Sequence, residues 1–521
     1  MSELTACAAC GAASAPDAVF CGNCGAALAL PGRPTKPAPV VVPSAVGHMP
    51  ERPSAPPRWG AGHDLTRYLC AAAYLDRDYA TSLVGQVAAE PHLGVAPAPA
   101  CDVPVVLRHA YLANVRRNYR DLVLAALLVL AFIFIFQGMV IGVLLSLFFS
   151  WVTVLSFELS TRYGRHLQSL RPDRFDPSTV PPATNEAAEA RIRQVGDYAA
   201  GNVTVYSGYS PFIGYGTQLE SWSFALDLTR PGSSGEPPGE FDVQDLYEHV
   251  LRRLRTLAVP GLEIEERVFV DGSAIIDDQR FLPDAFRRPV TGIPQDWVDD
   301  LKRAPEDRAR TYLAVHSTGW NGELVSSLFL RFARSDSNLL VEGVHTVLCP
   351  LLDRYRIIDT LMPSPGLRDV AQIFSQASAS TFFVLLASPA RAVQAFFAEW
   401  RTRRAVRRQN KRIRQLRVFD YGARISVRQQ ASDTAYHRYF QKLDRSMAVK
   451  VCERRALDAL VEFAEARHID VGDLVQRQQV IVNNGIIAQG GSKVEGSSVA
   501  SGDNASAFTR ILNKIPLVNT D

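Results

Sequence analysis

The sequence predicts a multidomain α+β protein that is anchored in a membrane. Residues 122–157 contain no charged side chain, whereas charged residues make up 21% of the whole chain. Apolar and polar residues alternate in several segments between positions 202 and 348, which is typical of strands. The chain has 521 residues, enough for several domains, and its hydrophobic fraction of 47% is that of folded proteins. The net charge of +3 is too small to indicate a nucleic-acid-binding protein.

Residues 1–30 contain four cysteines in two Cys-x2-Cys pairs: Cys7, Cys10, Cys21 and Cys24. Four thiolates suit a tetrahedral Zn²⁺, and metal binding can supply the folding energy that so short a segment lacks. The segment resembles the short zinc ribbons found at the ends of many bacterial proteins. This resemblance implies one structural zinc per chain and a docking module for a protein partner, without a catalytic position. Two disulfides or a redox pair are the alternatives, but no signal peptide precedes the cysteines and a reducing compartment is expected.

Residues 31–62 are rich in proline and predict an extended linker, either a plain spacer or a docking ligand. Residues 63–120 predict a helical juxtamembrane segment, because Leu65, Leu69, Ala72 and Ala73 recur at helical spacing. Breaks in the helical pattern are expected at Pro91 and at 97–104.

The uncharged run predicts a transmembrane hairpin over 121–158, with helices at about 122–136 and 139–157. One straight helix over the run would measure about 54 Å, against a hydrocarbon core of about 30 Å. Arginines flank both ends, which favours a cytoplasmic location for both termini. The Ala- and Arg-rich composition suggests a bacterial source, and hence the inner (cytoplasmic) membrane. A re-entrant loop, a single long span and a buried pair of soluble helices are the alternatives.

Residues 178–365 predict an α+β soluble domain with an antiparallel sheet. Asp242 is expected to cap a helix, and Asn321-Gly322 suits a type I′ turn. The expected strands are 202–207, 218–228, 262–270, 311–318, 324–332 and 339–348. The loop 208–216 is rich in glycine and aromatic residues; it could bind a ligand or lipid, but covering the sheet edge is the simpler interpretation.

No linear catalytic motif occurs, so the chain is not predicted to be an enzyme and no catalytic or cofactor-binding residue is assigned. His316 and His345, with Glu323 and Glu342 nearby, could form a metal or acid–base site. Histidines on strands are more often packing groups.

Residues 366–417 predict an amphipathic basic helix, capped by Ser388 with Pro389 at its first position. An apolar stripe is followed by a run of cations: Ala390, Val393, Phe396, Phe397 and Trp400, then Arg401, Arg403, Arg404, Arg407, Arg408, Lys411, Arg412, Arg414 and Arg417. The arginines suit anionic lipid headgroups, and the aromatic stripe favours lipid over nucleic acid. A packed helix with a solvated basic face is the other alternative.

Residues 418–479 predict a helical segment that includes an amphipathic helix over 436–466, whose apolar face must pack on the core or on a second copy. Residues 480–521 predict a Gly- and Asn-rich β tail, with glycines at 485, 491, 496 and 502. The tail loosely resembles amyloid-type signalling motifs, which implies self-association into a homo-oligomer.

These features together predict a membrane-anchored, cytoplasm-facing adaptor, scaffold or sensor. Two other hypotheses remain: an oligomeric pore-forming or membrane-perturbing protein, and an enzyme whose site has no linear motif. Converging histidines and carboxylates in the folded core would favour the enzyme.

We predict that a peptide covering residues 1–30 binds one equivalent of Zn²⁺ under reducing conditions, because its four thiolates complete a tetrahedral shell. Metal analysis together with thiol titration checks the stoichiometry. Four freely titrating thiols and no bound zinc would contradict the site, and replacing Cys7 and Cys10 by serine provides the control.

Overall fold

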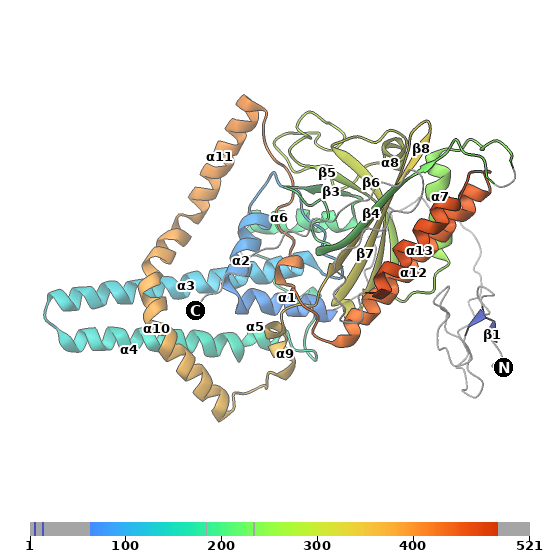
Figure 1. Cartoon of the computed structure of the whole chain (residues 1–521). Coiled ribbons are helices and arrows are strands. Elements are labelled where there is room, and N and C mark those ends of the chain that lie inside the picture. Colours follow the sequence, from blue (N-terminus) through green and yellow to red (C-terminus); the bar gives the residue numbers. More distant parts are fainter. Residues whose placement is uncertain (1–4, 7–12, 15–62, 184, 233–234, 488–521) are drawn as a thin grey trace, which may run out of the picture.

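The computed structural model describes residues 5–6, 13–14, 63–183, 185–232 and 235–487 (Figure 1). The four cysteines of the predicted zinc site, the proline-rich linker and the tail after Ile487 lie outside these residues. The described chain has three parts: a sheet domain, a helical base beside it, and long apolar helices that extend from the base (Figure 1). A mixed α+β fold is therefore confirmed.

The helical base is assembled from segments far apart in sequence. It contains α1 (His63–Leu75), α2 (Arg77–Ser82), a π-helical turn (Leu83–Ala88), α5 (Arg165–Gln168), α6 (Glu186–Gly196) and α9 (Ile357–Thr360). Leu65, Leu69, Leu107 and Tyr355 are buried in its core. The predicted helical segment 63–120 is confirmed, and the expected break separates Ala88 from Val103.

A helical hairpin extends from this base, as predicted. Helix α3 (Val103–Phe136) runs without interruption from the base into the uncharged segment, and α4 (Val140–Arg162) returns. The turn contains Gly138 at φ +69°, a conformation that suits glycine. A third long helix, α10 (Leu367–Phe396), lies within the segment 366–417 that the sequence predicts as one basic amphipathic helix. All three helices are long and apolar enough to cross a membrane.

The expected helix start at Ser388 and Pro389 is wrong, because α10 continues through both residues to Phe396. Proline lacks the N–H that would reach the carbonyl of Leu385. The hydroxyl of buried Ser388 donates to that carbonyl at 2.7 Å instead, so the helix tolerates the proline. The basic residues form a separate helix, α11 (Ala398–Leu416), which follows α10 after Phe397.

The sheet contains all six expected strands in the spatial order β3-β5-β6-β7-β8-β4. They are β3 (Val203–Tyr206), β4 (Thr217–Asp227), β5 (Leu262–Asp271), β6 (Ala309–Gly319), β7 (Leu324–Arg334) and β8 (Asn338–Leu348). Only β3 and β5 pair in parallel. Asn321 and Gly322 in the β6–β7 connection have φ of +55° and +89°, the left-handed values that a type I′ turn requires.

Helices cover one face of this sheet, and the aromatic loop contributes to the other. Helix α7 (Val243–Arg255) starts at a capping box made by Asp242 and Asp245, as the cap prediction required. It packs on the sheet with α12 (Tyr439–Glu465), while α8 (Gln295–Arg303) packs against β6 and β7. On the other face, Phe212 and Tyr215 of the loop are buried against Phe269, Tyr312 and Phe329.

Helix α12 confirms the amphipathic helix expected at 436–466, and it places its apolar face on the protein's own sheet. Leu457 and Leu460 are buried there, whereas Phe440 and Met447 nearer the start of the helix are exposed. The following helix, α13 (Gly472–Ile487), includes residues 480–487. The β structure expected from Val480 onward is therefore wrong as far as Ile487.

One buried arginine ties the sheet domain to the base. The guanidinium of Arg428 is fully buried and donates to the carbonyl oxygens of Pro99 at 2.7 Å and Glu323 at 2.9 Å. Burial lowers its pKa to about 10, so the group keeps its charge at neutral pH. Among the residues described, no carboxylate forms an ion pair with Arg428. The two backbone carbonyls are therefore the groups that stabilise its buried charge.

We predict that Arg428→Met lowers the free energy of unfolding by about 3 kcal/mol, because two buried carbonyls lose a charged donor while the aliphatic volume is kept. Thermal or chemical unfolding in detergent measures the effect. Arg424→Met, at an exposed position four residues earlier, is the matched control and should change stability little. Equal losses in the two variants would contradict the role of Arg428.

Candidate membrane interface and polar sites

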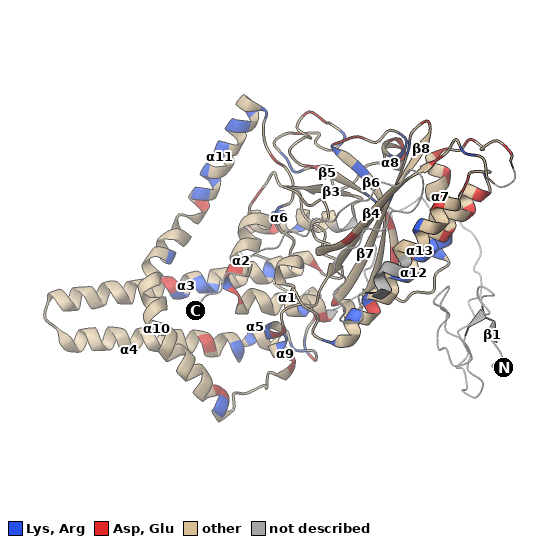
Figure 2. Cartoon of the chain, viewed as in Figure 1, with Lys and Arg blue, Asp and Glu red and all other residues tan. Residues whose placement is uncertain are grey.

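Helix α10 crosses both helices of the hairpin close to the level at which their charged residues end (Figure 2). Leu124 of α3 and Val154 of α4 form a buried apolar cluster with Ala377 and Leu385 of α10. Leu124 lies three residues beyond Asp121, the last charged residue of α3, which is about 4.5 Å along the helix. The crossing therefore lies at the boundary between the charged and the uncharged part of the hairpin.

Polar contacts also fix this crossing. The indole N–H of Trp151 donates to the hydroxyl of Ser378 at 3.0 Å, and Arg162 donates to the amide oxygen of Gln376 at 2.9 Å. Both contacts hold α10 against α4, while Leu385, seven residues beyond Ser378, belongs to the apolar cluster that includes Leu124 of α3. The contacts thus pass from one hairpin helix to the other along α10, as expected for a helix that lies across the pair.

Large apolar side chains are exposed on the hairpin and on the outer side of α10. On the hairpin they include Phe136, Ile141 and Leu144, and on α10 they include Phe374, Phe382, Phe383 and Leu386. An exposed apolar surface of this extent on a soluble protein would be unusual. Sequence reasoning identifies Phe396 at the end of α10 but misses Phe374, Phe382 and Phe383, although they lie within an apolar stretch that was a usable signal.

The predicted membrane-surface residues lie at the α10–α11 junction and along α11. Phe396, Phe397 and Trp400 are all exposed. Cations recur along α11, whereas the outer hairpin carries no charge (Figure 2). Arg403 pairs with Glu399 at 2.7 Å, and Arg404 lies over the Trp400 ring at 5.1 Å. Among the described residues no acidic partner contacts Arg407, Arg408, Lys411 or Arg412 within 4.0 Å.

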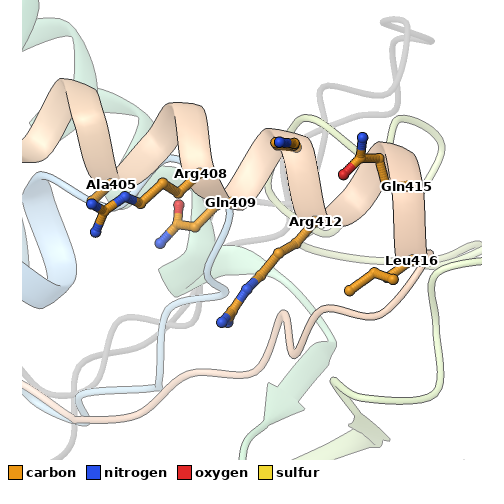
Figure 3. Close-up of a pocket in the computed structure, with 7 residues that line it drawn as sticks. Ala405, Arg408, Gln409, Arg412, Gln415 and Leu416 are labelled. Atoms are coloured by element: carbon orange, nitrogen blue, oxygen red, sulfur yellow. The ribbon is translucent and has the colours of Figure 1, made fainter.

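The end of α11 returns to the sheet domain. Ile413 is buried with Tyr421 in the core beside α8, and Gln409 donates to Glu90 at 3.1 Å. A shallow hollow beside this stretch is lined by α11 alone, and Arg408 and Arg412 extend from it one turn apart (Figure 3). A hollow with a single wall suits contact with an extended surface better than enclosure of a small ligand.

A second concave site lies where α12 passes the β4–β8 edge of the sheet. His345 Nε2 lies 2.9 Å from Glu453 Oε1, and the Trp222 indole donates to the same carboxylate oxygen. Sequence reasoning singled out His345 but missed Glu453, because 108 residues separate the pair.

His316 belongs to a different, buried polar network on the opposite face of the sheet. Its Nδ1 lies 2.7 Å from the hydroxyl of Ser327, its Nε2 lies 3.3 Å from Glu265, and the Tyr215 ring stacks on it. Arg267 donates to both oxygens of Glu265. Ser327, His316 and Glu265 have the composition of a nucleophile–base–acid triad, but Ser327 and His316 have no exposed surface that a substrate could reach.

The four residues considered as a site from the sequence do not come together. His316 and His345 are on β6 and β8, with β7 between them and their side chains on opposite faces. Glu323 pairs with Arg356, and Glu342 pairs with Arg331 at 3.1 Å. Within the described ranges no group of three or more His, Cys, Asp or Glu residues could hold a metal ion.

The fold and these sites define an α+β protein with a helical hairpin and an apolar surface suited to a membrane. The model of the AbeC-like domain family matches residues 221–495, more than half of the chain. The chain therefore belongs to the AbeC-like domain family. The match begins within β4, includes β5, β6, β7 and β8, α10 and α11, and extends through α13 past the described residues; β3 precedes it. No curated protein and no solved structure matches the chain.

The His316 network links stability to pH. Burial raises the pKa of the Glu265 carboxyl, but the charge of Arg267 and the hydrogen bond from His316 outweigh burial and hold that pKa well below its usual range. Burial lowers the pKa of His316 below its ordinary value of 6.5, against the opposing effect of Glu265. At neutral pH the network therefore contains an ionised carboxylate and a neutral imidazole.

We predict that the protein loses stability as the pH falls below about 6.5. In that range His316 is protonated more readily in the unfolded chain than in the folded chain. The folded state loses at most about 1.4 kcal/mol of stability for each unit by which folding lowers the pKa of His316. The contribution of Glu265 is complete above its ordinary pKa and is lost as the pH falls through its lowered folded-state pKa. Unfolding temperatures at pH 7.5 and 5.5 should differ less in His316→Gln than in the wild type. An unchanged difference in this variant would assign the acid sensitivity to other groups.

Proposed function

We propose that this protein is a membrane-anchored, cytoplasm-facing scaffold or sensor whose sheet domain is held at the membrane surface by the hairpin and α10 together. The hairpin enters the bilayer, and α10 lies in the plane of the interface. The observation that carries this proposal is that α10 crosses both hairpin helices about one turn from the last charged residue of each: Leu124 lies three residues from Asp121, and Val154 lies four residues from Glu158. Aromatic residues such as Phe382 and Phe383 would then lie at headgroup level, where amphipathic helices bury their apolar side.

The connections of α10 support an in-plane helix over a third membrane span. Before α10, Ile358 is buried in the core of the helical base; after it, Ile413 is buried in the sheet domain. A helix that crossed the bilayer would deliver its end to the opposite side. Helix α11 would then have to bring the chain back through the bilayer with its many arginines, at a cost of about 3 kcal/mol for each central arginine.

The uncharged part of the hairpin is long enough to enter the bilayer from one side and return to the same side. Leu122 to Phe136 would extend about 22 Å along the helix, less than a hydrocarbon core of about 30 Å. The tip would therefore reach the far interface only with local thinning of the bilayer. The arginines that flank the hairpin favour a cytoplasmic location for the base, the sheet domain and both termini.

Helix α11 would extend the contact along anionic headgroups. Each arginine near an anionic surface contributes about 1 kcal/mol, and cations without acidic partners are free to do so. The predicted zinc ribbon, tethered by the proline-rich linker, would then recruit a protein partner to the membrane-held sheet domain. Self-association through the C-terminal region remains part of the proposal.

Depth measurements test this arrangement. A fluorescent non-natural amino acid is placed at one exposed position at a time, and quenching by lipids brominated at known depths is recorded in vesicles. Labels at Phe374, Phe383 and Phe396 along α10 should all report one shallow depth. Labels at Leu122, Val129 and Phe136 along α3 should become progressively deeper and serve as the matched comparison.

A maximum of depth in the middle of α10 would show a third span and overturn the proposal. A label at Tyr209, which is fully exposed on the sheet domain, should not be quenched in either arrangement. Quenching at that position would show that the sheet domain itself enters the bilayer, and would equally contradict the proposed anchor.

A further inference from the structure

A cavity of about 130 Å³ lies between α12, the start of β4, the end of β8 and Ile481 of α13. Three cations of α12 line it: Lys442, Arg445 and Lys450. Lys442 lies three residues from Arg445 and eight from Lys450, so the three cations lie along one side of the helix. The cavity belongs to the sheet domain and is separate from the proposed membrane contact.

Charge in this cavity is not balanced by its own residues. Glu453 already accepts from Trp222 and lies in hydrogen-bond distance of His345, and Glu220 is exposed. In the described part of the chain, no carboxylate oxygen lies within 4.0 Å of a side-chain nitrogen of the three cations. Lys442 and Arg445 lie about one turn apart, and like charges at this spacing repel one another, so an anion beside them would be stabilising.

The donors available suit an oxyanion. Arg445 donates to Ser446 Oγ at 3.2 Å, while its buried Nε has no hydrogen-bond partner in the described structure. A guanidinium presents donors in a planar fork that matches phosphate oxygens, and lysine ammonium groups add point charges. A cavity of about 130 Å³ has room for a phosphate group.

We propose that this cavity binds a small, multiply charged oxyanion of the phosphate class, held by Lys442, Arg445 and Lys450. The inference goes beyond the proposed anchor and does not depend on it. The phosphate group could belong to a free solute or to a lipid headgroup. In both cases the same phosphate oxygens would accept hydrogen bonds from the three cations. The cavity would give the sheet domain a ligand to sense.

The test measures the unfolding temperature of the full chain in neutral detergent during titration with pyrophosphate, at ionic strength held constant with chloride. The wild type should show a saturable increase. The double variant Lys442→Gln/Lys450→Gln should bind about tenfold more weakly or worse, the equivalent of at least 1.4 kcal/mol. Arg454→Gln removes an exposed cation of the same helix outside the cavity and should keep the wild-type affinity.

A second arm replaces pyrophosphate with short-chain phosphatidic acid in the same detergent. Saturable stabilisation by the lipid alone, lost in the double variant, would assign the site to a headgroup; stabilisation by pyrophosphate would assign it to a solute. Equal responses to pyrophosphate and chloride, without lipid stabilisation, would overturn the proposal. Equal loss in Arg454→Gln and the double variant would overturn it as well, because the effect would then be general charge screening.

Discussion

The structure depends on guanidinium groups that are buried between segments far apart in sequence. Arg428 joins the loop at Pro99 to the β6–β7 turn, and Arg288 donates to the carbonyls of Val87 and Glu90. Arg67 contacts Asp64, Asp359 and the carbonyl of Leu170, which follows the hairpin. An arginine cannot release its charge inside a protein, so each one must keep all of its acceptors in place. The hairpin, the helical base and the sheet are thereby held as one unit.

The sheet and the hairpin could be predicted because their signals are local. Apolar and polar residues alternate in several of the six strands, and Asn321-Gly322 has the backbone freedom that its turn needs. The prediction at α10 is wrong because Pro389 after Ser388 is the pattern of a helix start. The hydroxyl of Ser388 replaces the hydrogen bond that Pro389 cannot donate, and the sequence pattern does not reveal this replacement. Only the apolar stretch before Ser388 indicates that the helix begins earlier. At Val480–Ile487, glycine and β-branched residues predicted β structure, but the segment continues the helix that starts at Gly472.

The polar sites could be predicted only in fragments. His316 and His345 are identified from the sequence as strand histidines, yet their carboxylate partners come from β5 and α12. Glu265 lies 51 residues from His316, and Glu453 lies 108 residues from His345. The three cations of the α12 cavity look in sequence like an ordinary solvated helix face. Only the placement of β4 and β8 opposite them makes the site concave.

The crossing of α10 over a short hairpin has a mechanical consequence. In the proposed arrangement most of the inserted volume lies in the leaflet that faces the sheet domain. Helix α10 lies wholly within that leaflet, and only the two hairpin helices continue deeper into the bilayer. Such a wedge expands one leaflet relative to the other, and the elastic energy of insertion then depends on the curvature of the bilayer. The protein would partition toward convex regions of the leaflet that it enters, so its position in the cell would follow membrane shape as well as membrane charge.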